Sequence, residues 1–336
     1  MTSLPLLPNV EAPAKLVGIA RIAAEGESLR EGHNVEYFTL GTRSLLNRVV
    51  SRRNLPFAWA INPYRGCEFA CKYCYARYTH EFMELRDGIE FEQKIFVKQH
   101  AAELLRRELR RVKPGEGIAI GTATDPYQPA ERRFEVTRGI LEELSRHAGL
   151  DLGIVTKSNL IVRDVEILRR VAENNRLHVS MTVTTVRTDL ARILEPRAPR
   201  PDLRLEALRQ LNVAGVCAGV MCAPVLPEIT DAPRDLEALV KAASVARAAF
   251  IFANPLFLKP CSAAVFLPFL EENFPALVET YRRRYAGRAF LPKGYGQRIS
   301  QLMAALRDKY GIGSRHRARN QPTRGGKGTQ QLDLFR

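Results

Sequence analysis

The sequence predicts an α/β protein built around a parallel sheet, and two patterns carry this prediction. Apolar runs with the composition of β-strands alternate along the chain with stretches in which apolar residues recur every three or four positions. Such alternation is typical of βα units, in which parallel strands are covered by helices. Unusual polar segments also follow the first three strands, at the sheet edge where ligands bind. The pattern leaves open whether the sheet closes into a barrel.

The predicted elements follow one another regularly from residue 58 onward. Strands are expected at 58–62, 117–124, 151–157, 177–183, 216–225 and 248–256. Between them, helices are expected at 98–109, 136–148, 163–175, 202–215 and 234–248. In each helical stretch the apolar residues lie on one face, as packing against a sheet requires.

The segments on either side of this repeat differ in character. Residues 1–55 hold three prolines among the first 13 positions and few periodic runs, so we expect a mostly irregular lead-in with one strand at 35–40. The α/β repeat occupies 56–260, and a helical extension is expected at 261–310. The remaining segment, 311–336, is rich in glycine and basic residues and is expected to be a flexible tail.

Composition and charge limit the classes of protein that fit. The chain has 336 residues with 51 Lys+Arg against 36 Asp+Glu, a formal net charge of +15. This excess points to a polyanionic partner, nucleic acid first and an acidic membrane surface second. No run approaches the roughly 18 apolar residues of a membrane span, and no secretory signal is recognisable, so a cytoplasmic protein is expected. In that compartment six cysteines do not indicate a disulfide framework.

Three of the cysteines cluster in the loop after the first strand. Cys67, Cys71 and Cys74 lie within eight residues, so no long loop must close to bring three thiolates to one metal centre. Zinc would need a fourth ligand, for which His80 is the nearby candidate. A cubane iron–sulfur cluster would instead leave one iron open for a substrate or cofactor. Buried structural cysteines are the remaining alternative.

The segment from Cys67 to Cys74, CEFACKYC, resembles the CxxxCxΦC motif of radical S-adenosylmethionine (SAM) enzymes, with Tyr73 as the aromatic residue. The resemblance implies a partial (β/α)6 barrel, which agrees with the six predicted strands. It implies that the three cysteines hold a [4Fe–4S] cluster whose fourth iron binds SAM. Reductive cleavage of SAM would then produce a 5′-deoxyadenosyl radical, with an electron donor such as flavodoxin or ferredoxin as a further partner.

A wider set of residues resembles the spore photoproduct lyase-like branch of that superfamily, whose lyase splits a methylene-linked thymine dimer in DNA. The matching stretches are NPYRGC at 62–67, YAR at 75–77 and TDPYQPAE at 124–131. The resemblance spans residues 55 to 260, and its cysteine motif is the most specific part.

The resemblance also implies a SAM pocket at the ends of the second to fourth strands. Tyr73 is expected beside the adenine, and the rest of SAM is expected to contact Thr122, Thr124, Asp125, Lys157, Ser158 and Ser180. Two alternatives stay open: Asp125 can start a turn by bonding its own backbone, and Ser158 can cap a helix. The substrate cavity is expected to involve Arg65, Arg77 and Glu195.

The group that returns a hydrogen atom to the product is a separate question. Some members of this branch use a cysteine downstream of the cluster, but no cysteine lies between Cys74 and Cys217 here. Cys222, near the carboxyl end of the fifth strand, and Tyr127 are therefore the candidates for hydrogen-atom donor or relay. The alternative for Cys222 is a buried small apolar residue.

The last residues carry a second motif. The segment QLDLF, from Gln331 through Leu332, Asp333 and Leu334 to Phe335, resembles the pentapeptide with which bacterial repair and replication proteins bind the DNA polymerase sliding clamp. Two leucines and an aromatic suit an apolar pocket, and a flexible tether limits the ordering cost. The alternative is a terminal turn that folds back on the protein.

Together these expectations describe a radical SAM enzyme that acts on damaged or modified DNA, as a lyase-type repair enzyme recruited by the sliding clamp. Two alternatives stay open at this point. The first is a radical SAM enzyme that modifies RNA or protein, and the second is a non-catalytic iron–sulfur module that binds DNA.

Overall fold

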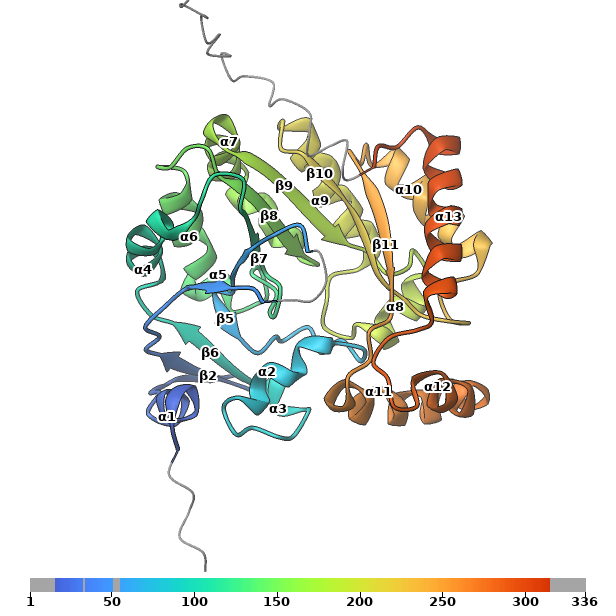
Figure 1. Ribbon diagram of the computed structural model, residues 1–336, viewed down its shortest axis with the longest axis horizontal. Coiled ribbons are helices and arrows are strands. Elements are labelled where there is room, and N and C mark those ends of the chain that lie inside the picture. Colours follow the sequence, from blue (N-terminus) through green and yellow to red (C-terminus); the bar gives the residue numbers. More distant parts are fainter. Residues whose placement is uncertain (1–15, 33, 51–54, 315–336) are drawn as a thin grey trace, which may run out of the picture.

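The computed structural model describes residues 16–32, 34–50 and 55–314. Within these ranges the largest element is a seven-stranded sheet with the order β11-β10-β9-β8-β7-β4-β3 (Figure 1). Neighbouring strands from β4 to β11 pair in parallel, whereas β3 (Leu46–Arg48) is antiparallel to β4. The parallel strands are β4 (Trp59–Ile61), β7 (Gly117–Ile120), β8 (Asp151–Thr156), β9 (Arg176–Thr182), β10 (Ala218–Val225) and β11 (Ile251–Pro255). The six predicted strands and the partial barrel are thereby confirmed.

Helices between these strands cover the sheet. Each predicted amphipathic stretch forms a helix: α4 (Ala101–Glu108), α6 (Val136–Leu144), α7 (Val165–Asn174), α9 (Pro201–Val213) and α10 (Pro233–Val245). Their buried faces, with residues such as Leu105, Ile140 and Leu208, pack on fully buried strand residues such as Ile154 and Val220. The main core therefore lies between these helices and the parallel sheet, as the periodicity predicts.

The lead-in is less irregular than expected, because it contributes to a second sheet. This four-stranded sheet has the order β1-β2-β6-β5, formed by β1 (Ser28–Gly32), β2 (Val35–Leu40), β6 (Lys94–Lys98) and β5 (Tyr64–Arg65). The predicted strand at 35–40 is β2, and α1 (Gly18–Ala24) packs beside it. Strand β6 pairs in parallel with β2, although the two strands are far apart in the sequence. Such a long-range pairing has no local sequence signal.

The C-terminal region is helical, as predicted. It contains α11 (Pro260–Asn273), α12 (Val278–Tyr285) and α13 (Lys293–Tyr310). Figure 1 shows α13 beside β11, and Phe250 bridges to Gly313 there, so this helix covers the edge of the sheet. No helix in the described ranges is long and apolar enough to cross a membrane. The clamp-binding-like segment at 331–335 lies outside the described residues.

The shorter helices belong to the loops at the carboxyl ends of the parallel strands. They are α2 (Tyr78–Glu81), α3 (Glu90–Gln93), α5 (Glu131–Phe134) and α8 (Thr188–Leu194). Parallel strands all end at the same edge of the sheet, so the loops after β4, β7, β8 and β9 meet there. This meeting of loops positions the candidate site.

Candidate functional site

The three clustered cysteines lie on one loop, which follows β4 and the short strand β5. Gly66 precedes Cys67 with a φ of +83°, and a Cβ at this position would lie 2.6 Å from the carbonyl oxygen of Lys94. Only glycine fits there without strain. The backbone N–H of Cys67 donates to the carbonyl oxygen of Phe91 at 2.8 Å, which attaches the loop to the segment before β6.

The surroundings of these thiols suit a multi-iron cluster. Cys67 and Cys71 are buried, Cys74 is half-buried, and the three form no disulfide within the described chain. Burial raises the pKa of Cys71 to about 12, and burial, Asp125 and the two neighbouring thiols raise the pKa of Cys67. In the described ranges no three His, Cys, Asp or Glu side chains could hold a single metal ion. Cys71 and Cys74 lie close enough to Cys67 to raise its pKa, and three neighbouring thiols on one loop fit a cluster in which each binds a different iron.

His80, the proposed fourth ligand of a zinc site, is occupied elsewhere. Its Nε2 lies 3.1 Å from the carbonyl oxygen of Lys94, and its ring packs edge-on against Phe91 and Phe96. Burial lowers its pKa to about 4, so the imidazole is neutral. The geometry therefore gives the zinc alternative no support.

The loop after β7 holds the cysteine loop in place. The hydroxyl of Thr124 donates to the carbonyl oxygen of Gly66 at 2.6 Å, and the amide of Gln128 donates to the same oxygen at 3.2 Å. The side-chain oxygen of Gln128 accepts from the backbone N–H of Glu68 at 2.9 Å. Because Gly66 and Glu68 flank Cys67, these bonds determine where the first thiol lies.

Asp125 connects the same loop to the end of β8. Its Oδ1 accepts from the backbone N–H of Tyr127 at 2.9 Å and from the hydroxyl of Thr156 at 2.6 Å, and its Oδ2 accepts from the backbone N–H of Lys157 at 2.7 Å. The turn given as an alternative from the sequence is thus present. The carboxylate also joins two neighbouring strand ends, which the sequence did not indicate.

Tyr73 lies in a buried polar network. Its hydroxyl donates to the carboxylate of Glu195 and lies 3.0 Å from the hydroxyl of Thr184. Arg204 approaches the same carboxylate to 2.5 Å. Burial alone would raise the pKa of Glu195, but Arg204 and Lys157 outweigh it and lower that pKa. Glu195 therefore carries its charge inside this network, whereas the sequence suggested that it lines a substrate cavity.

The sequence reasoning did not single out Arg204, although a signal was present. On α9 this residue lies on the same face as the buried Ala207, Leu208 and Leu211. A charged residue on the apolar face of an amphipathic helix needs a buried partner. The helical pattern thus contained evidence for a buried ion pair but not for the identity of its partner.

Lys157 lies next to this network at the end of β8. Its Nζ is 5.7 Å from the centre of the Tyr73 ring. Burial alone would lower its pKa, but the neighbouring Cys71 and Glu195 raise it overall, so the side chain is a cation at neutral pH. The structure therefore gathers Lys157, Tyr73 and Cys71, which come from two separate loops.

The remaining SAM-site candidates are placed as follows. Thr122 accepts a hydrogen bond from the side-chain amide of Asn62 at 3.3 Å. The hydroxyl of Ser158 accepts from the backbone N–H of Leu160 at 3.2 Å, so it forms the helix cap given as its alternative. Ser180 is fully buried in β9, and its hydroxyl has no hydrogen-bond partner among the described residues.

The two donor candidates are both buried. Cys222 is completely buried in β10, with its Sγ 3.8 Å from the carbonyl oxygen of Thr184, so it lies beside the Tyr73 network. Tyr127 is 1% exposed, and burial followed by the nearby Asp164 and Glu131 raises its pKa far above the usual range. The two side chains therefore lie in different surroundings, and the hydroxyl of Tyr127 has no hydrogen-bond partner among the described residues.

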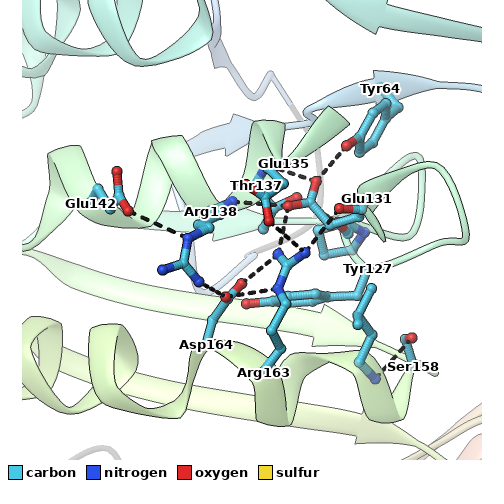
Figure 2. Close-up of polar contacts among 12 residues, drawn as sticks. Tyr64, Tyr127, Glu131, Glu135, Thr137, Arg138, Glu142, Ser158, Arg163 and Asp164 are labelled. Atoms are coloured by element: carbon cyan, nitrogen blue, oxygen red, sulfur yellow. Dashed lines mark hydrogen bonds and ion pairs between the residues drawn. The ribbon is translucent and has the colours of Figure 1, made fainter. Parts of the chain in front are cut away.

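Figure 2 shows the network around Tyr127, which the sequence did not reveal. The carboxylate of Glu131 accepts from the hydroxyl of Tyr64, from the backbone N–H of Thr137 at 2.9 Å and from Arg163 at 3.1 Å. Arg163 also donates to Asp164 at 2.9 Å. These bonds join the loops after β7 and β8 and the start of α6 into one buried unit.

Comparison with known proteins identifies the same superfamily that the cysteine motif resembles. The family model described as the radical SAM superfamily matches residues 61–241. An uncharacterized protein of Mycobacterium tuberculosis is 35% identical over 294 residues, which cover 87% of this chain and 86% of that protein. An uncharacterized protein of Methanocaldococcus jannaschii is 26% identical over 233 residues, which cover 69% of this chain and 83% of that protein.

Two solved structures have a similar fold. A spore photoproduct lyase complexed with dinucleoside spore photoproduct aligns with a TM-score of 0.60 and 16% identity, covering 82% of this chain and 79% of that chain. A variant of spore photoproduct lyase with bound AdoMet and dinucleoside spore photoproduct aligns with a TM-score of 0.62 and 15% identity, with the same coverage. At such identities the similarity concerns the fold.

Proposed function

Because this chain belongs to the radical SAM superfamily, whose members use a [4Fe–4S] cluster and SAM, we propose that it is a radical enzyme acting on damaged or modified DNA. The observation that carries the enzymatic part is the buried loop that presents Cys67, Cys71 and Cys74 at the carboxyl edge of the sheet. When bound there, the cluster and SAM would supply a 5′-deoxyadenosyl radical able to abstract hydrogen from a carbon of the lesion.

In this proposal the three cysteines are the cluster ligands. Their thiols must lose protons to bind iron, and burial keeps Cys67 and Cys71 protonated until metal is present. Gly66 and Gln128 hold the loop in the binding conformation through the bonds described above. The chain therefore contributes a preformed loop, so little conformational entropy is lost when the cluster binds.

SAM is proposed to bind between the cysteine loop and the ends of β7, β8 and β9. Lys157 is a buried cation next to Tyr73 and Cys71, and it suits the SAM carboxylate through a charge-assisted hydrogen bond. Ser180 supports the same location, because its buried hydroxyl has no partner among the described residues and is available to accept a hydrogen bond from a ligand or donate one to it. The other proposed contacts are Tyr73, Thr122, Thr124, Asp125 and Ser158.

The DNA substrate is proposed from two supporting facts. The chain carries a net charge of +15, which suits a polyanion. Its fold resembles that of spore photoproduct lyase, a protein solved with a dinucleoside lesion bound. We therefore propose a lyase-type reaction on a base lesion, with an electron donor of the flavodoxin or ferredoxin class.

Cys222 is the proposed hydrogen-atom donor. Transfer of hydrogen from its thiol to a carbon radical of the product would form a C–H bond and leave a thiyl radical on the sulfur. Burial beside Thr184 would keep that radical away from solvent. Tyr127 is the proposed relay, because its buried hydroxyl has no hydrogen-bond partner among the described residues.

Recruitment to DNA by the sliding clamp is proposed from the segment QLDLF at 331–335. Its test is direct binding of the purified clamp to the full chain. The Phe335→Ala variant should lose that binding while SAM cleavage is unchanged. Equal clamp binding by the wild type and the variant would contradict this part of the proposal.

The enzymatic proposal is tested anaerobically with the reconstituted protein, dithionite and SAM, by following 5′-deoxyadenosine with and without ultraviolet-irradiated DNA. Product that increases with irradiated DNA and disappears in Cys71→Ala would support a lesion-directed enzyme. Cys217→Ala is the matched control, because that thiol lies outside the cysteine loop. An amount of 5′-deoxyadenosine that does not change when DNA is added would contradict the proposed substrate. Absence of 5′-deoxyadenosine from protein with a fully loaded cluster would contradict catalysis.

A further inference from the structure

A cavity of about 590 Å³ opens beside the cysteine loop, where the loops after β7, β8 and β9 meet. The loop after β7 contributes Pro129 and Arg132, and the loop after β8 contributes Ser158. The segment between α8 and α9 contributes the wall at 197–200, and Phe69 of the cysteine loop completes it. The cavity therefore borders both the cysteine loop and the carboxyl ends of three strands, and of the SAM-site candidates assigned above only Ser158 lines it.

The lining of this cavity is strongly positive. Its charged side chains are Arg132, Arg192, Arg197 and Arg200, and none of the described residues that line it is acidic. All four arginines are exposed, so their charges face solvent at the cavity rather than the protein interior. A group of like charges at one opening produces a local positive potential that attracts anions.

Two of the four guanidinium groups have no hydrogen-bond or ion-pair partner among the described residues, although the charge of Arg197 acts on Glu68 and opposes the rise that burial causes in the pKa of that carboxyl. Arg200 forms an ion pair with Asp202 at 2.7 Å, and Arg192 donates to the carbonyl oxygen of Pro196 at 3.3 Å. In the part of the chain that the structure describes, the side chains of Arg132 and Arg197 have neither an ion pair nor a hydrogen bond. Each guanidinium presents five N–H donors in a planar fork that matches the oxygens of a phosphate.

The positive wall is attached directly to the cysteine loop. The backbone N–H of Arg197 donates to the carbonyl oxygen of Phe69 at 3.4 Å, and that of Lys72 donates to the carbonyl oxygen of Leu194 at 3.0 Å. The arginines at 192 and 197 are therefore carried on a segment with a defined position relative to Cys71. An anion bound here would be held at a defined place beside the loop that we propose to bind the cluster.

We propose that this arginine cavity binds the phosphodiester backbone of the nucleic-acid strand on which the enzyme acts. The inference rests on the proposed DNA function and adds where the strand is held. Several arginines around one large opening suit a chain of phosphates better than a single small anion. Free phosphate shares the same chemistry, so the test must separate the two sources.

The test measures DNA binding by the full-length protein with its cluster reconstituted. A fluorescent single-stranded DNA of about 15 nucleotides is titrated at salt concentrations between about 50 and 200 mM. The test variant is R132Q/R197Q, and R107Q/R170Q is the matched control. The control removes the same two charges from exposed arginines of α4 and α7 that do not line the cavity. Melting temperature and cluster absorbance confirm that each variant is folded and loaded.

Expected results follow from the electrostatics of phosphate binding. R132Q/R197Q should bind DNA about tenfold more weakly than the wild type. The slope of log K against log salt, which is negative, should become less steep by about 1.4, the value for two lost contacts to a single strand. The control should bind like the wild type. Unlabelled DNA should displace the probe at phosphate concentrations where inorganic phosphate does not.

Other outcomes overturn the inference in distinguishable ways. If R132Q/R197Q and the control bind DNA equally, the cavity does not hold the strand, but the proposed DNA function is unaffected. If inorganic phosphate displaces the probe as well as DNA does at equal phosphate concentration, the cavity is a site for free phosphate. Equally effective competition by polyglutamate would assign the cavity to acidic proteins. If the wild type binds no DNA, the proposed substrate and this inference both fail.

Discussion

The guanidinium of Arg204 lies 2.5 Å from the carboxylate of Glu195, and each side chain is only 1% exposed. The same carboxylate accepts a hydrogen bond from the hydroxyl of Tyr73, and from that of Thr184 at 2.8 Å. Helix α9, the end of β9 and the aromatic residue of the cysteine loop are thus joined through one buried charge pair. The stability of the cysteine loop therefore depends on a helix that contributes no cysteine.

Replacing Arg204 by methionine should destabilise the protein strongly. The variant leaves the Glu195 carboxylate buried without its cation, which typically costs about 3–5 kcal/mol. The free energy of unfolding, measured by urea denaturation, should decrease by that amount. Arg200→Met is the matched control, because its ion pair with Asp202 is exposed and should contribute less than about 1 kcal/mol. Equal losses in both variants would contradict the proposed importance of the buried pair.

Gly66→Ala should prevent the cysteine loop from forming. The new Cβ would lie 2.6 Å from the carbonyl oxygen of Lys94 and 2.9 Å from that of Phe91, and both are backbone atoms that cannot move cheaply. Iron content and cluster absorbance after reconstitution should be largely lost. Gly115→Ala isolates the backbone strain, because its φ of +84° is nearly the same but no atom lies within 4 Å of the new Cβ. This control should lose about 1 kcal/mol of stability and retain the cluster.

Lys98 should make stability increase with pH in the alkaline range. Burial, assisted by the charge of Arg65, lowers its pKa from 10.5 to about 7. Between these two values the unfolded chain binds a proton that the folded chain lacks, so rising pH favours the folded state. The gain is at most about 1.4 kcal/mol per pH unit. It is absent below about pH 7, where both states are protonated.

Lys98→Met should flatten this dependence, measured as the urea midpoint from about pH 7 to pH 10. The exposed Lys113→Met should preserve the slope seen in the wild type. A wild-type curve that falls with pH over this window, or a slope unchanged in Lys98→Met, would show that Lys98 does not titrate as described.

Lys157→Met should weaken SAM binding without loss of the cluster. The ammonium lies near Tyr73 and Cys71, and removal of a charge-assisted bond to the SAM carboxylate should raise the SAM dissociation constant by about tenfold. Equilibrium dialysis of the reconstituted protein measures this constant, and absorbance reports the cluster. Lys113→Met again serves as the control. An unchanged dissociation constant would remove Lys157 from the proposed SAM pocket.

The sequence predicted the parallel core better than its surroundings. Strands β4, β7, β8, β9, β10 and β11 and the helices between them were all expected, because each has a local apolar period imposed by burial on a sheet. The pairing of β2 with β6 was not expected, since it joins segments separated by the whole cysteine loop. Likewise, nothing local to Glu131 or Arg163 indicates that they meet (Figure 2).

By itself, the sequence determined the order of βα units, the motif of Cys67, Cys71 and Cys74 and hence the family, because these depend on local spacing. Only the tertiary structure decided which loops meet at the carboxyl edge of the sheet. It placed Lys157 beside Tyr73, paired Glu195 with Arg204 and brought Arg132 and Arg197 to one cavity. The physical reason is that a helix or strand is determined by the spacing of apolar residues within its own segment. The partner of a buried charged residue comes from a distant segment and is brought close only when the chain folds.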